Sequence, residues 1–109
     1  MGTVTNITRV KFSVGDVVQH QRFAYRGVIV DVDSRFHASD EWYDLVAKSR
    51  PPKNKPWYHV LVHGSDHSTY VAERHLQHDD SGEPVDHPMM DHFFSEFVDG
   101  KYRRIEPDN

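Results

Sequence analysis

Histidine is the most obvious source of chemistry in this 109-residue chain, which holds nine of them. His63 and His67 stand four residues apart, a spacing that on a helix would place two imidazoles on one face, where they could bind a metal ion. Here Gly64, Ser65 and Asp66 separate them, and this sequence is typical of a turn. Because no third and fourth ligand follow at a standard spacing, we expect no metal site and no cofactor.

Two groups of residues have the composition of a hydrolytic site. Asp80 and Ser81, with a histidine on either side, lie in the polar segment 79–88, which lacks a nucleophile-elbow pattern. Asp31 and Asp33 would share one face of a strand, as paired hydrolytic carboxylates do, but any solvated strand face gives the same alternation. The sequence has no P-loop, dinucleotide-binding or metalloprotease motif, so we expect no catalytic residues and no enzyme.

Basic residues interleaved with aromatic ones are the strongest binding signal. Arg22 and Arg26 flank Phe23 and Tyr25, and the segment KSRPPKNKP, residues 48–56, carries four positive charges and no acid. Cations can hold phosphates while aromatic faces stack on exposed bases. A solvated proline loop, with Arg26 packed over Tyr25, is the alternative that composition alone favours. The predicted nucleic-acid-binding residues are Arg22, Tyr25, Arg26, Lys48, Arg50, Lys53 and Lys55.

The net charge of −4 limits how large a phosphate-binding surface can be. Residues 1–78 carry ten Lys and Arg against eight Asp and Glu, a balance of +2, whereas residues 79–109 carry three against nine, a balance of −6. Proteins that bind nucleic acid over a broad surface normally have a clear basic excess. We therefore expect a local phosphate-binding surface, whose few contacts would give weak and strongly salt-dependent binding.

The elements that position these side chains are predicted to be mainly strands. Apolar residues alternate over 28–33, where Val28, Val30 and Val32 are expected on one face, and Gly27 would let the chain bend as it enters this strand. A tight turn is expected to follow the last of four strands and to bury Leu76. Four or five short strands predict a mainly β fold, a small SH3-like or Tudor-like β-barrel. The four strands are expected over 17–20, 28–33, 57–63 and 69–73.

A short helix is expected in the long loop before the third strand. Ser39 can cap it, because a serine side chain can accept a hydrogen bond from a backbone N–H in the first helical turn. Trp42, Leu45 and Val46 would share its apolar face. The prolines of residues 48–56 then exclude both helix and strand, so this segment is expected to be an extended loop.

A second, amphipathic helix is expected at the C-terminus. Pro88 suits the first helical position and Gly100 the end, and residues 101–105 could add an edge strand. Four apolar residues between them follow the i, i+3, i+4, i+7 spacing of one helix face. This stripe either seals the barrel or binds a partner protein or a second copy of the chain. The predicted partner-binding residues are Met90, Phe93, Phe94 and Phe97.

The length of the chain favours a single domain. We expect a flexible arm over residues 1–10, the β-barrel domain over 11–105 and a flexible C-terminus over 106–109. The N-terminus lacks the apolar stretch of a signal peptide, no segment approaches the length of a membrane span, and there is no cysteine. A cytoplasmic location without membrane contact is therefore the simplest expectation.

Several segments together resemble one known family. They are KFSVGDVVQHQRFAYRGVIVDVDSRF from residue 11, EWY at 41–43, KPWYHVLV at 55–62, YVAE at 70–73 and HP at 87–88. This combination resembles the YccV-like hemimethylated-DNA-binding family over about residues 11–102. The resemblance implies a small β-barrel without catalytic residues, a cytoplasmic location and self-association. The family tends to have an asparagine where this chain has His75, so any role carried over to that position is in doubt.

Two activities come with this resemblance. One is the binding of hemimethylated DNA. The other is a role in heat stress, in which the protein promotes degradation of denatured or specific proteins, such as the replication initiator, by an ATP-dependent protease of the Lon type. The alternative is a protein-binding adaptor or protease modulator without physiological DNA binding. The family brings no established set of DNA-contacting residues, so the site residues above depend on charge alone.

Overall fold

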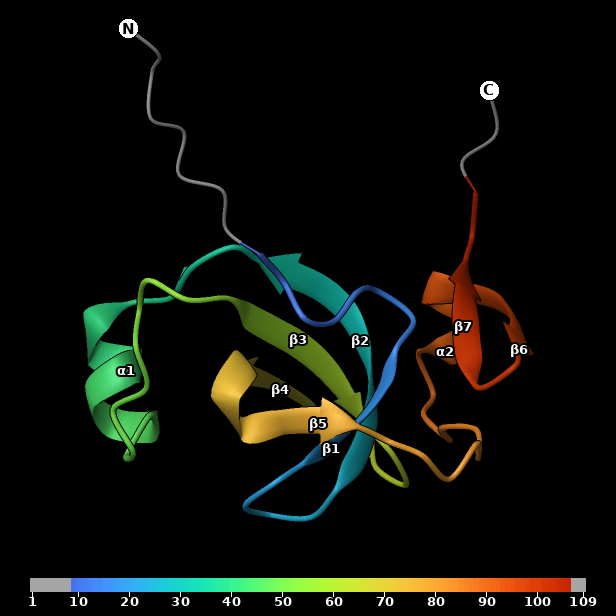
Figure 1. The fold of residues 1–109 in the computed structure, drawn as a ribbon, viewed down its shortest axis with the longest axis horizontal. Helices are drawn as coiled ribbons and strands as arrows, with labels where there is room; N and C mark the ends of the chain where they lie inside the picture. The colour runs from blue at the N-terminus through green and yellow to red at the C-terminus, as the bar shows by residue number, and fades with distance from the viewer. Residues whose placement is uncertain (1–8, 107–109) are drawn as a thin grey trace, which may run out of the picture.

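The computed structural model describes residues 9–106 (Figure 1). The arm expected over residues 1–10 lies outside them except for its last two residues, and so do residues 107–109 of the expected C-terminal tail. No helix in the described part of the chain is long and apolar enough to cross a membrane. In chain order the elements are β1 (Val17–His20), β2 (Arg26–Asp33), α1 (Asp40–Val46), β3 (Trp57–Val62), β4 (Ser68–Ala72), the 3-10 turn η1 (Glu73–His75), β5 (Leu76–His78), α2 (Met90–Phe93), β6 (Phe94–Val98) and β7 (Lys101–Arg104).

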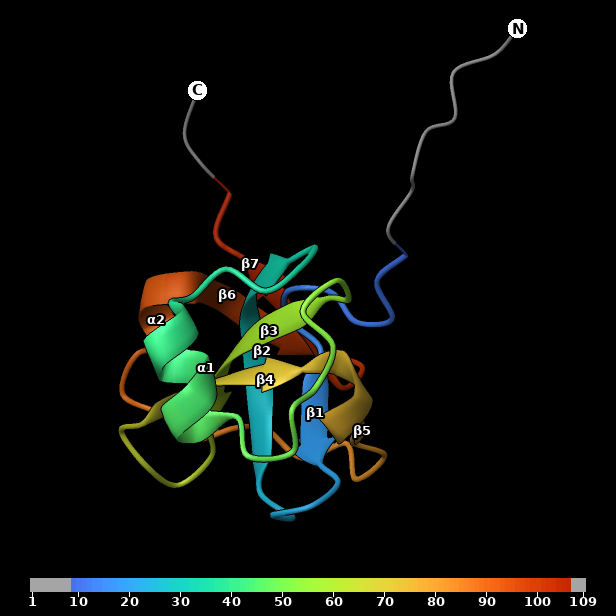
Figure 2. The same cartoon turned by 90° about the vertical axis from the view of Figure 1, so that its left-hand side faces the viewer.

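The first five strands form one antiparallel sheet in the order β4-β3-β2-β1-β5. Strands β6 and β7 form a separate hairpin, which lies on one side of the sheet, while α1 lies at the opposite end (Figure 1). The predicted mainly β fold is confirmed. Within residues 9–106 no ladder joins the edge strands β4 and β5, so the sheet is curled but not closed into a barrel (Figure 2).

A β-bulge in β2 determines which side chains of this strand lie on each face of the sheet. The register of β2 on β3 shifts between Ile29 and Asp31, which leaves Val30 as an extra residue. Val28 and Val30 therefore pack on one face of the sheet, while Val32 joins Ile29 on the other. The prediction of three valines on one face was wrong, because a bulge reverses the alternation of all residues beyond it. As a result β2 is apolar on both faces.

Each face of the sheet has its own apolar cluster. A third cluster lies beneath α1 and is aromatic. The first cluster holds Phe12, Val18, Ile29, Tyr58, Val60, Val71 and Leu76; the second holds Val17, Val28, Leu61, Val85, Phe94 and Tyr102; the third holds Tyr43, Trp57 and Ala72. The second cluster needs the C-terminal hairpin as its cover.

The helix expected from Pro88 to Gly100 is limited to the single turn of α2. A bulge in β6 brings Phe94 and Phe97 to the same side, with ring centroids 5.2 and 4.5 Å from that of Tyr102. The bulge thus gives a strand the three-residue spacing that is typical of a helix. The helix prediction was therefore wrong, whereas the edge strand expected after Gly100 is confirmed as β7.

The sequence itself contains a signal for the turn of this hairpin. Asp99 and Gly100 have φ of 54° and 77°, and Val98 pairs directly with Lys101. Asp-Gly is a favoured two-residue hairpin loop because both positions need positive φ. Gly100 therefore ends a strand and turns the chain, instead of ending a helix.

Helix α1 begins where predicted but buries a different face. The Trp42 backbone N–H donates to Ser39 Oγ at 3.1 Å, which confirms the cap. The buried residue is Tyr43, whose hydroxyl donates to the Pro51 carbonyl at 2.7 Å. Leu45 and Val46 are 71% and 55% exposed. The predicted apolar face was therefore wrong for Leu45 and Val46, because α1 packs through the Tyr43 ring and hydroxyl onto the loop that follows it. Trp42, the third residue of that face, does pack against the aromatic cluster.

Gly27 is required for space between strands β2 and β3. A Cβ at this position would lie 2.5 Å from the Leu61 carbonyl oxygen and 2.5 Å from Val60 Cγ1. Both distances are far below van der Waals contact, and one of the atoms belongs to the backbone. The glycine therefore permits the close approach of β3 to β2 at the start of the ladder.

We predict that Gly27→Ala destabilises the protein by about 1–3 kcal/mol, the usual cost of forcing a methyl group into a packed interior. Urea unfolding followed by tryptophan fluorescence measures this change. Ser68→Ala, on the exposed end of β4, is the control and should stay within about 0.5 kcal/mol of the parent. Equal stability of Gly27→Ala and the parent would show that the two strands can move apart at no cost.

Candidate nucleic-acid interface

An open groove of about 570 Å³ lies between the β1–β2 loop, β4, and α1 with the loop that follows it. This volume falls within the range of roughly 300–1,000 Å³ that is usual for small-ligand sites. Its lining is unusually aromatic. The aromatic and imidazole rings that line it are His20, Phe23, Tyr25, Trp42, Trp57, His59, Tyr70 and His75.

The first group of rings is built around His20. Its ring centroid lies 4.8 Å from that of Phe23, 5.1 Å from that of Tyr25 and 5.6 Å from that of His75. Phe23 is 69% exposed at the tip of the β1–β2 loop. The Tyr25 hydroxyl is hydrogen-bonded to Thr69 Oγ1 at 2.8 Å, which ties this loop to β4. One wall of the groove is therefore a stack of rings with an exposed phenyl group at its end.

The second group of rings is centred on Tyr70. Its ring centroid lies 5.2 Å from that of Trp57, 5.7 Å from that of Trp42 and 4.5 Å from that of His59. The Tyr70 hydroxyl donates to Asp33 Oδ2 at 2.6 Å and accepts the His37 backbone N–H at 2.9 Å. Burial and the hydrogen bond to Asp33 raise the pKa of Tyr70, so its hydroxyl stays protonated.

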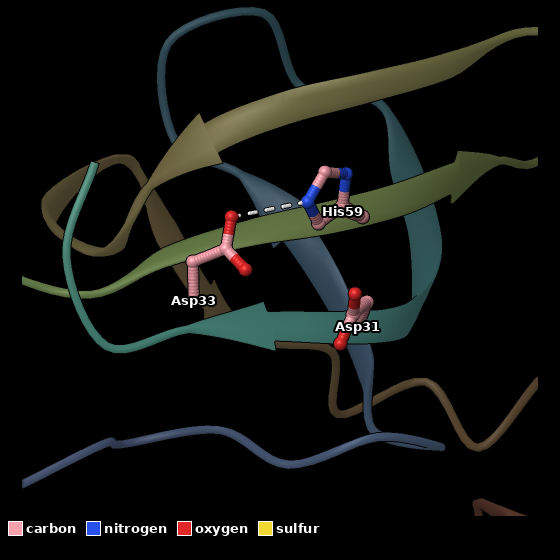
Figure 3. A group of neighbouring side chains, drawn as sticks. All are labelled: Asp31, Asp33 and His59. Atoms are coloured by element: carbon pink, nitrogen blue, oxygen red, sulfur yellow. Dashed lines mark hydrogen bonds and ion pairs between the residues drawn. The ribbon is translucent and has the colours of Figure 1, made fainter. Parts of the chain in front are cut away.

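Asp31, Asp33 and His59 form the cluster in the structure with the composition of a metal site. Their nearest ligand atoms lie within 4.8 Å of one another, and His59 Nε2 is 3.3 Å from Asp33 Oδ2. Figure 3 shows the Asp33 carboxylate turned toward the imidazole, with Asp31 earlier on β2. Asp33 already accepts from Tyr70. Asp33 therefore fixes two rings of the groove wall, those of Tyr70 and His59.

The charged lining of the groove is exclusively basic. Among the described residues no Asp or Glu lines it, although the whole chain has 17 of them. Arg22 and Lys48 are its exposed cations. Neither forms an ion pair within residues 9–106, and the Arg22 guanidinium lies 5.7 Å from the centroid of Phe23. Three of the predicted residues, Arg22, Tyr25 and Lys48, are thus brought together here.

The other cations of the proline loop lie outside the groove lining. Arg50 Nη1 lies 2.7 Å from Asp44 Oδ1 and Lys53 Nζ lies 3.0 Å from Asp40 Oδ1, and both cations sit over the Tyr43 ring. Their charge is therefore partly neutralised by the acids of α1. Lys55 is exposed.

Arg26 connects β2 to the segment that follows β5. Its guanidinium lies 3.0 Å from Asp79 Oδ2 and donates to the carbonyl oxygens of Glu83 and Pro84. Burial raises the pKa of Asp79, but hydrogen bonds from Ser81 and Arg26 outweigh burial and hold that pKa below its ordinary value. The Arg26 side chain is thus occupied by protein groups in this structure.

The apolar stripe predicted as a partner surface packs against the sheet. Phe94 is buried, and the other three residues of the stripe are half-buried against the second apolar cluster. Beside this stripe a second groove of about 790 Å³ separates the sheet from α2 and the end of β7. Met89 and Ile105 line it and are 42% and 48% exposed.

The family was established by comparison with known protein families. The model described as "Hemimethylated DNA-binding protein YccV like" matches residues 10–101. The chain belongs to the YccV-like family of hemimethylated DNA-binding proteins. The match includes both walls of the aromatic groove.

Sequence reasoning missed most of the ring residues of the groove. Tyr25 and Phe23 carried a signal, since they alternate with arginines, but Trp42, Trp57 and Tyr70 come from three separate elements. Only the folded sheet brings them to one surface.

His20 holds the β1–β2 loop in place as a neutral imidazole. Its Nδ1 accepts the backbone N–H groups of Arg22 at 3.1 Å and Phe23 at 3.0 Å, so the proton of the neutral ring resides on Nε2. Burial lowers the pKa of His20, and the neighbouring His75 and Arg22 lower it further. If Nδ1 were protonated, it could no longer accept these two hydrogen bonds, and its proton would repel the two N–H groups. The loop would then be released.

We predict that stability falls as the pH drops below about 6.5, the pKa of an unperturbed histidine. Because the folded-state pKa of His20 is lowered, the unfolded chain takes up the proton first, so stability is complete above this pH and lost below it. Urea unfolding at pH 7.5 and 5.5 measures the loss. His20→Asn keeps an acceptor near Nδ1 but cannot titrate, and should lose less stability; an equal loss in both proteins would assign the effect to other histidines.

Proposed function

We propose that this protein binds hemimethylated DNA without catalysing a reaction on it, and that the aromatic groove is the contact surface. Membership of the YccV-like family supports the ligand. The observation that carries the choice of surface is the lining of the groove, where cations and aromatic rings occur without an acidic side chain among the described residues. Away from the groove, the net charge of −4 makes the protein repel phosphates.

The proposed contacts divide into positioning and stacking groups. Arg22 and Lys48 hold phosphates beside the groove, while the rings of Phe23 and Trp42 contact bases. Lys55 extends the basic surface along the loop. Arg50 and Lys53 contribute less, because each would have to leave an acid of α1 to contact a phosphate.

We predict that Arg22→Glu combined with Lys48→Glu abolishes binding of a hemimethylated duplex at low salt. Each phosphate contact that is lost should reduce the slope of log affinity against log salt by about 0.9. Fluorescence anisotropy across a salt series measures both quantities. Lys53→Glu combined with Lys55→Glu makes the same change in net charge in the proline loop, and should reduce the affinity less because Lys53 already pairs with Asp40.

The two charge reversals separate the groove from the loop. A larger loss with the Lys53 and Lys55 pair than with the groove pair would move the interface to the proline loop. Equal losses would show that net charge, and not a defined surface, controls the binding.

A second function concerns protein degradation. We propose that the protein also promotes degradation of denatured or specific proteins, such as the replication initiator, by a cytoplasmic ATP-dependent protease of the Lon type, and that it self-associates. The groove beside the C-terminal hairpin favours a protein partner, because it leaves Met89 and Ile105 exposed next to apolar residues of the sheet. A protease modulator without physiological DNA binding remains the alternative function.

We predict that Met89→Ser combined with Ile105→Ser removes stimulation of a reconstituted Lon-type protease and leaves DNA affinity within twofold of the parent. Both side chains are substantially exposed, so the fold should tolerate the change. Degradation of a denatured reporter protein measures the stimulation. If this variant loses both DNA affinity and protease stimulation, the two activities do not use separate surfaces. If the parent protein stimulates the protease but does not bind DNA, the alternative of a protease modulator without physiological DNA binding is favoured.

A further inference from the structure

We infer that the aromatic groove receives a single nucleotide base that has left the double helix, so that the methylated base is recognised outside the stack. This inference depends on the proposed DNA binding and specifies what the groove holds. Enzymes that act on a base extrude it from the duplex and read it between aromatic or apolar side chains. Here the same arrangement would serve recognition alone.

The lining of the groove offers ring faces to a flat aromatic ligand. One wall ends in the exposed ring of Phe23, and the other carries the half-buried ring of Trp42. Base–aromatic stacking of this kind is sequence-tolerant and changes affinity by about 5- to 150-fold for each contact. Two such contacts can offset the cost of unstacking one base, and this cost is lowest when the base is mispaired or already single-stranded.

The charge of the protein also favours one extruded nucleotide over a long duplex contact. A duplex reader gains most of its affinity from many phosphate contacts. This groove offers two cations, Arg22 and Lys48, that form no ion pair with any residue from 9 to 106, in a chain with an acidic excess. An extruded nucleotide has one phosphate on each side of its sugar, and two cations are enough to hold these.

Polar groups inside the groove can orient the base. The His59 side chain is 43% exposed, and Ser49 Oγ is hydrogen-bonded to His75 Nε2 at 2.8 Å. These groups can bond the edge of a base while the rings cover its faces. A methyl group enclosed by the rings should add about fourfold to the affinity, the value of one buried CH₂. Methylation is thus read by contact with apolar rings.

The test compares three fluorescent DNAs of one sequence: a hemimethylated duplex, the same duplex with a mismatch opposite the methylated base, and the methylated single strand. Anisotropy titrations give the affinities, and quenching of tryptophan emission reports stacking in the groove. We expect the mismatched duplex and the single strand to bind several-fold more tightly than the paired duplex, because the base is already easier to extrude.

Substitutions at Phe23 separate stacking from apolar contact. Phe23→Ala should weaken binding of all three DNAs at least fivefold, Phe23→Tyr should restore it, and Phe23→Leu should not, because leucine lacks a ring face. The exposure of Phe23 makes these variants suitable, and a thermal melt verifies that each is folded. Restoration by leucine would contradict base stacking.

The outcomes distinguish this inference from the proposed function. If the paired and mismatched duplexes bind equally and Phe23→Ala has no effect, DNA binding stands and extrusion is rejected. If neither duplex binds, the proposed function fails, whereas binding of the single strand with quenched tryptophan emission would still support a base in the groove. If Phe23→Ala abolishes only stimulation of the protease, the groove holds a protein segment and the inference is overturned.

Discussion

The structure depends on burial of the central sheet on both faces. The bulge at Val30 makes β2 apolar on its two sides, and Gly27 lets β3 approach it closely. An exposed apolar face of this size would favour aggregation, so each face needs a cover. The C-terminal hairpin covers one face through Phe94 and Tyr102, and the curl of the sheet encloses the other.

The same arrangement explains why the groove is aromatic and free of acids. Its rings come from β1 and the β1–β2 loop, from α1, from β3 and β4 and from η1. The acidic excess lies in residues 79–109, and the described part of this segment, residues 79–106, runs to the hairpin on the other side of the sheet. Several acids near the groove already have partners. Asp33 accepts from Tyr70, and Asp40 and Asp44 pair with cations of the proline loop. Arg22 and Lys48 thus stand in a locally basic environment on an acidic protein.

The sequence was informative wherever local rules decide the structure. Alternating apolar residues located all four predicted strands, and Ser39 marked the start of α1. Local rules failed at the two bulges, because one inserted residue changes which face a side chain occupies. The bulge in β6 made strand residues resemble a helix, even though Asp99 and Gly100 carried a hairpin signal. At the candidate site, the positive charges in the sequence identified Arg22 and Lys48. The same pattern could not show that Arg26 pairs with Asp79, because these two residues are far apart in the sequence.

Mapping of the DNA contact by NMR tests the central claim most directly. Amide and indole resonances of the ¹⁵N-labelled protein would be followed while a hemimethylated duplex is added. The account predicts that the largest shifts occur at Arg22, Phe23 and Lys48 and at the indole N–H of Trp42. Shifts confined to residues 51–55 or to the C-terminal hairpin would contradict it.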